Sequence, residues 1–390
     1  MVTAAKPELI PFHRPLIEDE EIQAVVGVLK EGWITTGPKV HEFELAFADM
    51  VGARNAIAVN SCTAGLHIAL EAVGIMPGDE VLVPTLTFTA TAEVVTYFRA
   101  QPVLVDSEPG TFNLDPLKLE SAITSRTRAV IPVHFGGHPC QMEPIAKIAS
   151  AYGLTVVEDA AHAFPAKYKG RNIGELSPLT AFSFYATKTI TTGEGGMVTT
   201  ENDAFAQRMR LMRLHGMNQE AWKRYSGTGS WRYEVVAAGF KYNMTDIQAA
   251  LGLAQLRKAE RMRLRRTELA ARYSCGLRDC RAYQMLQVTP DVQHAWHLFV
   301  ILIEPKFFSI TRDQLIDELK ALGVGTAVHF IPLHRHPYYR DKWGYRPDQF
   351  PIAEWYFERC ISLPLYPGMS EDAIDLIVEH LRALARRFKR

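Results

Sequence analysis

The chain has 390 residues, of which 47% are hydrophobic and 22% are charged, and its 43 basic residues balance its 43 acidic residues. These values are typical of a folded globular protein and exclude a disordered chain and a globally basic nucleic-acid-binding protein. Five scattered cysteines without a CxxC pair predict neither a disulfide framework nor a structural zinc site. The length predicts two domains, or one large domain with an appendage.

The start of the chain, MVTAAKPELIPFHRPL, lacks the apolar core of a secretion signal. No apolar run elsewhere approaches the roughly 20 residues that a membrane span needs. We therefore expect a cytoplasmic protein with neither a membrane nor a nucleic acid as partner.

Two helices are expected first, at 15–30, where acidic residues fill the first turn, and at 41–52. Short apolar runs then alternate with helix-like segments up to about residue 200. Their nearly continuous apolar character is typical of strands buried on both faces of a parallel sheet. These runs lie at 56–60, 80–84, 102–106, 129–134 and 154–159.

The remainder of the chain predicts a smaller C-terminal α/β domain. A long helical pattern covers 244–278, and later segments read as strand, helix, strand and helix. The predicted boundaries are 1–255 for the N-terminal segment with the large domain, and 256–390 for the small domain. The later strands are expected at 297–305 and 325–333, and the later helices at 310–323 and 371–390.

Ligands of open α/β sheets bind at the carboxyl ends of the strands, and the residues there suggest an anion site. The strand at 56–60 is followed by Ser61, Cys62, Thr63, Ala64 and Gly65, which open a helix. Backbone N–H groups at such a helix start are suited to phosphate. A tight turn between strand and helix explains the same residues equally well.

Asp159 ends the apolar strand at 154–159, with His162 three residues later. A buried carboxylate needs a partner, so Asp159 is either a helix cap or ion-pair residue, or it holds the protonated ring nitrogen of a cofactor. A lone histidine such as His162 is more often a packing residue than a ligand.

Lys188 lies in AFSFYATKTITTGEGG (181–196), between a predicted strand and a glycine-rich turn. A lysine in such surroundings has a depressed pKa and becomes a nucleophile, whereas a lone lysine is more often a surface residue. With the anion site and Asp159, Lys188 completes a pocket for pyridoxal 5′-phosphate (PLP). Phe88, after the strand at 80–84, could stack on the PLP ring or pack in the core.

Six segments together make the chain resemble the DegT/DnrJ/EryC1/StrS family of PLP-dependent sugar-nucleotide aminotransferases. The resemblance implies an aspartate-aminotransferase-like fold (fold type I), with a large, mainly parallel-sheet domain and a smaller C-terminal α/β domain. It also implies a homodimer with shared active sites. The segments are 31–44, 60–70, 79–92, 156–163, 182–196 and 239–256.

The resemblance assigns Lys188 as the Schiff-base lysine and Asp159 as the partner of the ring nitrogen. It places Phe88 on one ring face, and His162, a second candidate catalytic residue, against the ring or its 3-hydroxyl. Further contacts implied are the phosphate with Thr63, Ala64 and Ser183, the phosphate with Asn243 of a second subunit, and the sugar nucleotide with His329, His334 and Tyr338. No metal is expected, because His334 and His336 have no further ligand nearby.

The implied activity is amino transfer from an amino acid, L-glutamate by family analogy, to a keto sugar nucleotide. GFKYNM (239–244) is similar to the 4-amino-4-deoxyarabinose branch, which favours a UDP-linked 4-keto sugar as acceptor. Family dehydratases carry histidine in place of Lys188, so the lysine favours transamination. The alternatives are a PLP-dependent dehydratase, a non-sugar aminotransferase and a non-catalytic regulatory member.

Overall fold

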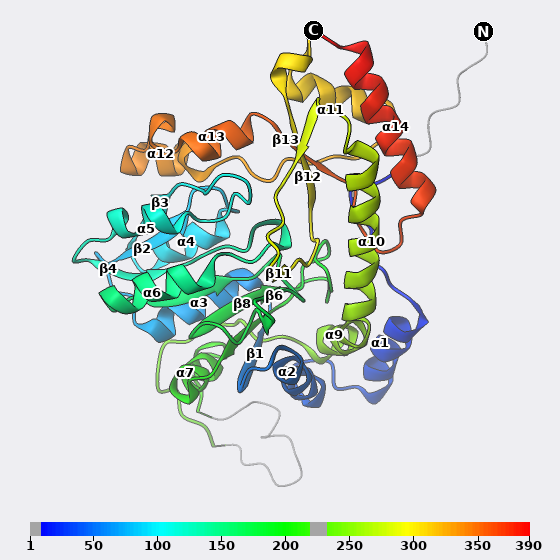
Figure 1. The fold of residues 1–390 in the computed structure, drawn as a ribbon. Coiled ribbons are helices and arrows are strands. Elements are labelled where there is room, and N and C mark those ends of the chain that lie inside the picture. Colours follow the sequence, from blue (N-terminus) through cyan, green and yellow to red (C-terminus); the bar gives the residue numbers. More distant parts are fainter. Residues whose placement is uncertain (1–8, 219–231) are drawn as a thin grey trace.

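A seven-stranded sheet forms the centre of the computed structural model, which describes residues 9–218 and 232–390 (Figure 1). Its strand order in the described residues is β1-β9-β8-β5-β4-β2-β3, and every strand except β9 runs in the same direction. The mainly parallel sheet is therefore confirmed. Its strands are β1 (Asn55–Val59), β2 (Glu80–Pro84), β3 (Gln101–Val105), β4 (Thr127–Val130), β5 (Thr155–Asp159), β8 (Leu179–Ser183) and β9 (Gly196–Thr200).

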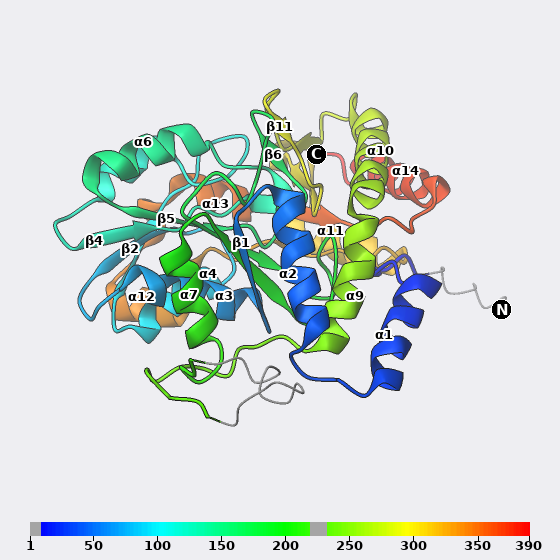
Figure 2. The same cartoon turned by 90° about the horizontal axis from the view of Figure 1, so that it is seen from below.

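Helices cover both faces of this sheet, which is why its strands are apolar at nearly every position (Figures 1 and 2). In β1, Ile57 and Val59 belong to one buried cluster, while Ala56 and Ala58 belong to the other. One face carries α3 (Cys62–Val73), α4 (Ala90–Tyr97) and α7 (Asp203–Met212), and the other carries α2 (Pro38–Val51), α6 (Met142–Tyr152) and α9 (Asp246–Arg257).

A second, antiparallel sheet with the order β10-β12-β13 lies in the C-terminal part of the chain, with its own buried cluster. No helix in residues 9–218 and 232–390 is long and apolar enough to cross a membrane. The elements of this part are β10 (Tyr283–Met285), β12 (Phe299–Ile303), β13 (Cys360–Leu363), α10 (Ala259–Leu277), α11 (Arg312–Ala321) and α14 (Glu371–Arg387).

Several shorter elements connect or flank these two sheets. A small antiparallel sheet has the order β11-β6-β7. It pairs β11, from the C-terminal part, with β6 and β7, which lie between β5 and β8 in the chain. The elements are α1 (Asp19–Glu31), α5 (Pro116–Leu119), α12 (Pro337–Trp343), α13 (Pro351–Phe357), β6 (Lys167–Tyr168), β7 (Arg171–Asn172) and β11 (Val292–Gln293).

The long helix predicted for 244–278 is two helices, α9 and α10, which meet at Lys258. The Lys258 ammonium is buried and forms ion pairs with Glu18, at 2.8 Å, and Glu21 of the N-terminal segment. The chain turns there because α9 packs on the large sheet while α10 contributes to the C-terminal cluster.

The strand predicted for 325–333 is wrong. That segment makes a single bridge to the second sheet, between Ala327 and Ser362, and the third strand of that sheet is β13 instead. Beyond the bridge, His329 and Phe330 turn into the wall of the large cavity described below. Pro332 has no backbone N–H to continue a ladder, so the segment leaves the sheet.

The C-terminal part of the chain also packs against the large sheet. Leu333, Tyr339, Ala353 and Tyr356 belong to the same buried cluster as one face of that sheet. The predicted division at residue 255 stays a prediction, and these contacts show that the segment from 333 to 357 shares a core with the N-terminal part.

Phe47 of α2 tests the packing on the face of the large sheet that carries α2, α6 and α9, because its ring contacts Phe164, Phe182 and Phe184 at centroid distances of 4.9, 5.0 and 5.5 Å. Replacing it by alanine in Phe47→Ala leaves a cavity and should lower the free energy of unfolding by about 3–5 kcal/mol in urea denaturation. Leu45→Ala on the exposed side of α2 should change it by less than about 0.5 kcal/mol. Equal losses would contradict this packing.

Candidate active site

A cavity of about 480 Å³ lies at the edge of the large sheet where the parallel strands end. The residues after β2, β5 and β8 line it, together with the start of α3 and the segment around His329 and Phe330. The structure thus brings together nine of the residues predicted from the sequence. They are Ser61, Cys62, Thr63, Phe88, Asp159, His162, Ser183, Lys188 and His329.

The start of α3 supplies the predicted anion site. Ser61 caps the helix, with its Oγ accepting from the Ala64 N–H at 3.1 Å. Gly196 pairs with Ser183 and lies so close to Ser61 that a Cβ there would be 2.6 Å from the Ser61 carbonyl carbon. The Ser183 strand end, the glycine turn and the helix start therefore meet at one point, where a helix start favours an anion.

Asp159 is the last residue of β5, is buried, and lines the cavity. Its Oδ2 accepts from the Thr91 hydroxyl at 2.8 Å, and its Oδ1 accepts from the Ala161 N–H at 3.1 Å. Burial raises the pKa of Asp159, although both hydrogen bonds and the nearby Lys188 oppose that change. A cationic group bound against this carboxylate would stabilise its ionised form.

Lys188 projects into the same cavity from the segment that follows β8. Burial of its ammonium lowers the pKa of Lys188 to about 8, with Cys62 and Asp159 opposing the change. At pH 7 about a tenth of the Lys188 side chains are then in the neutral amine form, which is the nucleophilic one, against fewer than about one in 10³ at the ordinary pKa. The alternative of a solvated surface lysine does not describe this side chain.

Two neutral imidazoles form one wall of the cavity. His162 and His297 lie with their ring centroids 4.3 Å apart, and burial lowers the pKa of both far below its usual range. The His162 Nδ1 accepts from the Gly136 N–H at 3.3 Å, which places its proton on Nε2. Phe330 stacks on the His162 ring at 5.8 Å and lies 6.1 Å from the Phe88 ring.

His297 and Phe330 are cavity residues that the sequence did not single out. His297 reads as the start of an apolar strand, and Phe330 lies inside a segment that was predicted as a strand. The available signal for Phe330 was Pro332, two residues later, because a proline is unusual in a central strand.

The remaining predicted residues lie outside the cavity lining. Ala64 is buried behind the helix start, and the Asn243 Nδ2 donates to the Thr36 Oγ1 at 2.6 Å. Tyr338 is largely exposed and bonds to Lys342 at 3.1 Å. His334 is fully buried with both ring nitrogens engaged, so neither is available to a sugar.

Comparison with known proteins adds a family to this geometry. A model of the DegT/DnrJ/EryC1/StrS aminotransferase family matches residues 15–382. The chain belongs to this aminotransferase family. The spore coat polysaccharide biosynthesis protein SpsC of Bacillus subtilis is 50% identical over 378 residues, which cover 97% of each chain.

Solved structures agree with the family. PseC of Helicobacter pylori, an aminotransferase involved in the biosynthesis of pseudoaminic acid, superposes with a TM-score of 0.92 at 27% identity and covers 98% of this chain and 100% of its own. Spr1654 of Streptococcus pneumoniae, named provisionally as a sugar aminotransferase and solved in a PLP form, has a TM-score of 0.90 at 34% identity, covering 97% and 99%. This chain is a PLP-dependent aminotransferase with the corresponding α/β fold.

The residues of the cavity fit PLP. The buried Asp159 carboxylate has a hydroxyl and an amide as hydrogen-bond donors and gains from a cationic ring nitrogen. The α3 start with Ser183 can accept the phosphate, and the Lys188 amine can react with the aldehyde. Phe88 and His162 also line this cavity.

The buried ammonium of Lys188 should cost stability in the cofactor-free protein. Its pKa of about 8, against the ordinary value of 10.5, means that folding disfavours the charged form. The cost, about 3 kcal/mol, is present in full below pH 8 and disappears as the pH rises to 10.5. Lys188→Met should therefore raise the free energy of unfolding by about 1–3 kcal/mol at pH 7, with the gain shrinking above pH 8.

Urea denaturation at pH 7 and pH 10 measures this difference, and Lys306→Met at an exposed position serves as the control. A gain for Lys188→Met that is the same at both pH values would show that the ammonium is not desolvated.

Proposed function

We propose that this enzyme transfers the amino group of L-glutamate to a keto sugar nucleotide, with a UDP-linked 4-keto sugar as the acceptor and an amino sugar nucleotide as the product. The observation that carries the proposal is the shared cavity of Lys188, with its lowered pKa, and the buried carboxylate of Asp159. An amine and a carboxylate in one cavity are suited to a cofactor that carries an aldehyde and a protonated ring nitrogen.

Lys188 is the residue that transfers protons in the proposed reaction. When bound, PLP supplies an aldehyde that condenses with amines and a ring that accepts the electron pair of a broken bond. The neutral Lys188 amine can take a proton from the donor's α-carbon and return it on the cofactor side, since its pKa of about 8 lies near neutral pH. Asp159 keeps a proton on the ring nitrogen, which stabilises negative charge on the ring.

The walls of the cavity would orient the reactants. Phe88 offers a ring face for stacking, and the Nε2 proton of His162 can be donated to a ring substituent. His329 also lines the cavity, and its Nδ1 lies 2.8 Å from the Ser362 hydroxyl. We assign His329 and the exposed Tyr338 to the sugar side, and Asn243 to the phosphate bound in a second subunit of a homodimer.

The sugar substrate is supported by the names of relatives. SpsC is a polysaccharide biosynthesis protein, and PseC acts in the biosynthesis of pseudoaminic acid. Another structure of similar fold, DesI, was solved in the presence of its TDP-sugar product, with a TM-score of 0.87 at 30% identity. The UDP base and the 4-keto position rest on the sequence resemblance of the 239–244 segment.

An isotope experiment tests the proposal. The purified enzyme with PLP is incubated with ¹⁵N-labelled glutamate and either UDP-linked or TDP-linked 4-keto sugars, and the products are identified by mass spectrometry. We expect ¹⁵N in the UDP-sugar product and release of the keto acid. Loss of water without incorporation of ¹⁵N would favour the dehydratase alternative, and the absence of ¹⁵N from both sugar products would favour a different acceptor.

Two substitutions separate the roles of the central residues. Lys188→Ala should lower turnover at least about 10³-fold, because both the covalent and the proton-transfer steps lose their group. Asp159→Asn should lower it at least about 10²-fold while PLP still binds. Stopped-flow absorbance of the glutamate half-reaction measures both, and Lys306→Ala on the surface is the control. Turnover retained in Lys188→Ala would contradict the assignment.

A further inference from the structure

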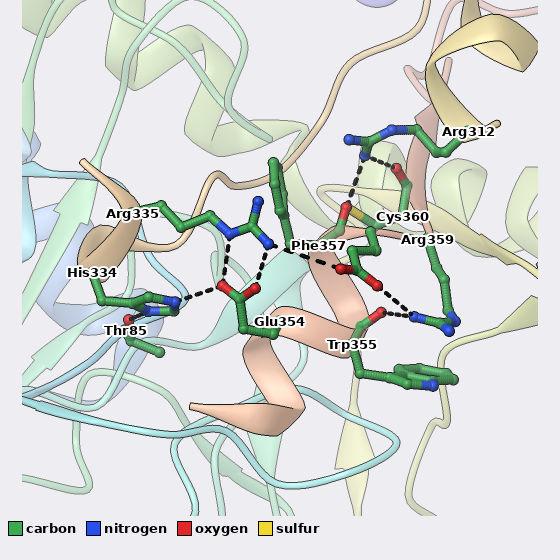
Figure 3. A network of polar contacts seen from close by, with 10 residues as sticks. Thr85, Arg312, His334, Arg335, Glu354, Trp355, Phe357, Arg359 and Cys360 are labelled. Carbon is green, nitrogen blue, oxygen red and sulfur yellow. Dashed lines mark hydrogen bonds and ion pairs between the residues drawn. The ribbon is translucent and has the colours of Figure 1, made fainter. Parts of the chain in front are cut away.

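We propose that His334 is a positioning residue that holds the loop between β2 and α4, and with it Phe88, in place for the PLP ring. The proposal rests on the proposed function and adds a role for a residue that lies outside the cavity lining. It starts from a buried chain of hydrogen bonds, Glu354–His334–Thr85, between the C-terminal segment and the end of β2 (Figure 3).

Thr85 is the first residue after β2, and its N–H, carbonyl and hydroxyl each make a hydrogen bond. Its N–H donates to the Val105 carbonyl at 2.8 Å, and its carbonyl accepts from the Leu333 N–H at 2.8 Å. Its Oγ1 lies 2.7 Å from the His334 Nδ1. Two of these three hydrogen bonds are made with consecutive residues of the C-terminal segment, Leu333 and His334.

The imidazole of His334 is itself immobilised. Its Nε2 lies 2.6 Å from the Glu354 Oε1, and its ring stacks on Phe350 at 4.5 Å with an interplanar angle of 17°. The carboxylate requires a proton on Nε2, so Nδ1 of the neutral ring accepts from the Thr85 hydroxyl. Burial lowers the pKa of His334 and favours this neutral form.

Glu354 receives a second donor, since the Arg335 Nε bonds to its Oε1 at 2.6 Å. Figure 3 shows His334 and Arg335 converging on Glu354 of α13. The start of α13 is tied to the large sheet, because Asp106, which follows β3, accepts from the Ala353 N–H at 3.0 Å. The contacts therefore run from Thr85 at the end of β2, through His334 and Glu354, to Asp106 at the end of β3.

A carboxylate, an imidazole and a hydroxyl in sequence also resemble the relay of a nucleophilic hydrolase. Thr85 is fully buried and is absent from the lining of the large cavity, so its hydroxyl has no access to a substrate there. The arrangement can hold a loop in position and cannot attack a carbonyl.

The loop that Thr85 starts leads directly to the cofactor site. Phe88 lies on the cavity wall three residues later, and the Thr89 hydroxyl is 2.8 Å from the Tyr339 hydroxyl of α12. The loop is thus anchored to the C-terminal segment on both sides of Phe88. Thr91, just beyond the second anchor, donates to Asp159. A shift of Thr85 would consequently move both the stacking ring and the hydrogen bond to the ring-nitrogen partner.

Thr85→Val tests the proposal, because valine keeps the shape of threonine and removes the hydroxyl. The matched control is Thr200→Val, whose buried hydroxyl donates to the Pro178 carbonyl at 2.6 Å at the opposite end of the large sheet. Thr85→Val loses one hydrogen bond of the hydroxyl, and Thr200→Val loses two, because the Thr200 hydroxyl also accepts from the Asn202 N–H at 3.1 Å. The control should therefore lose at least as much thermal stability as Thr85→Val. PLP is then titrated into each cofactor-free protein, and the visible circular dichroism of the bound PLP is recorded.

We expect Thr85→Val to weaken PLP binding roughly tenfold and to reduce the circular dichroism band, which reports the seating of the ring. Thr85→Ser should restore both within about twofold, and Thr200→Val should match the wild type. Glu354→Gln, which removes the charge behind His334, should change both readouts in the same direction and to a smaller extent. If Thr85→Val does not fold, Glu354→Gln still tests the proposal.

Wild-type values for Thr85→Val, or equal changes in Thr85→Val and Thr200→Val, would overturn the positioning role and leave the proposed function intact. A wild-type protein that binds PLP and fails to transfer nitrogen would overturn the proposed function, while the PLP titration still decides the role of His334. A wild-type protein that binds no PLP would overturn both.

Discussion

The desolvation of the Lys188 ammonium is the constraint on which the rest of the site depends. The lysine is held in a cavity where water cannot fully solvate its charge, and this lowers its pKa to about 8. The same burial acts in the opposite direction on Asp159, whose pKa rises. Each group is thereby prepared for a ligand that offers a carbonyl to the amine and a cationic ring nitrogen to the carboxylate.

The sheet explains why these groups meet. Six of the seven strands run in one direction, so the residues that follow β1, β2, β5 and β8 arrive at one edge. β9 runs the other way and begins at that edge, which brings Gly196 against Ser61. The C-terminal segment then closes the cavity with His329 and Phe330, and the buried chain through His334 joins it to the β2 end of the sheet.

Much of the fold could be predicted because the buried strands carry a strong local signal. The runs at 56–60 and 80–84 correspond to β1 and β2 within a residue, since strands covered on both faces are apolar throughout. The cavity positions of Lys188, Asp159 and Ser183 also follow from strand ends. The break at Lys258 and the irregular 325–333 segment could not be predicted, because an ion pair with Glu21 of α1 and contacts across the cavity decide them.

The sequence by itself determined the family, the fold class and the main cavity residues, because these depend on strand periodicity and on motifs whose parts are close together in the chain. The tertiary structure alone decided the role of residues such as His297, which joins His162 at 4.3 Å, and His334, which bonds to Thr85 across 249 positions of sequence. Both histidines look alike in the sequence. Only burial and the identity of distant partners determine whether an imidazole faces a ligand or holds a loop.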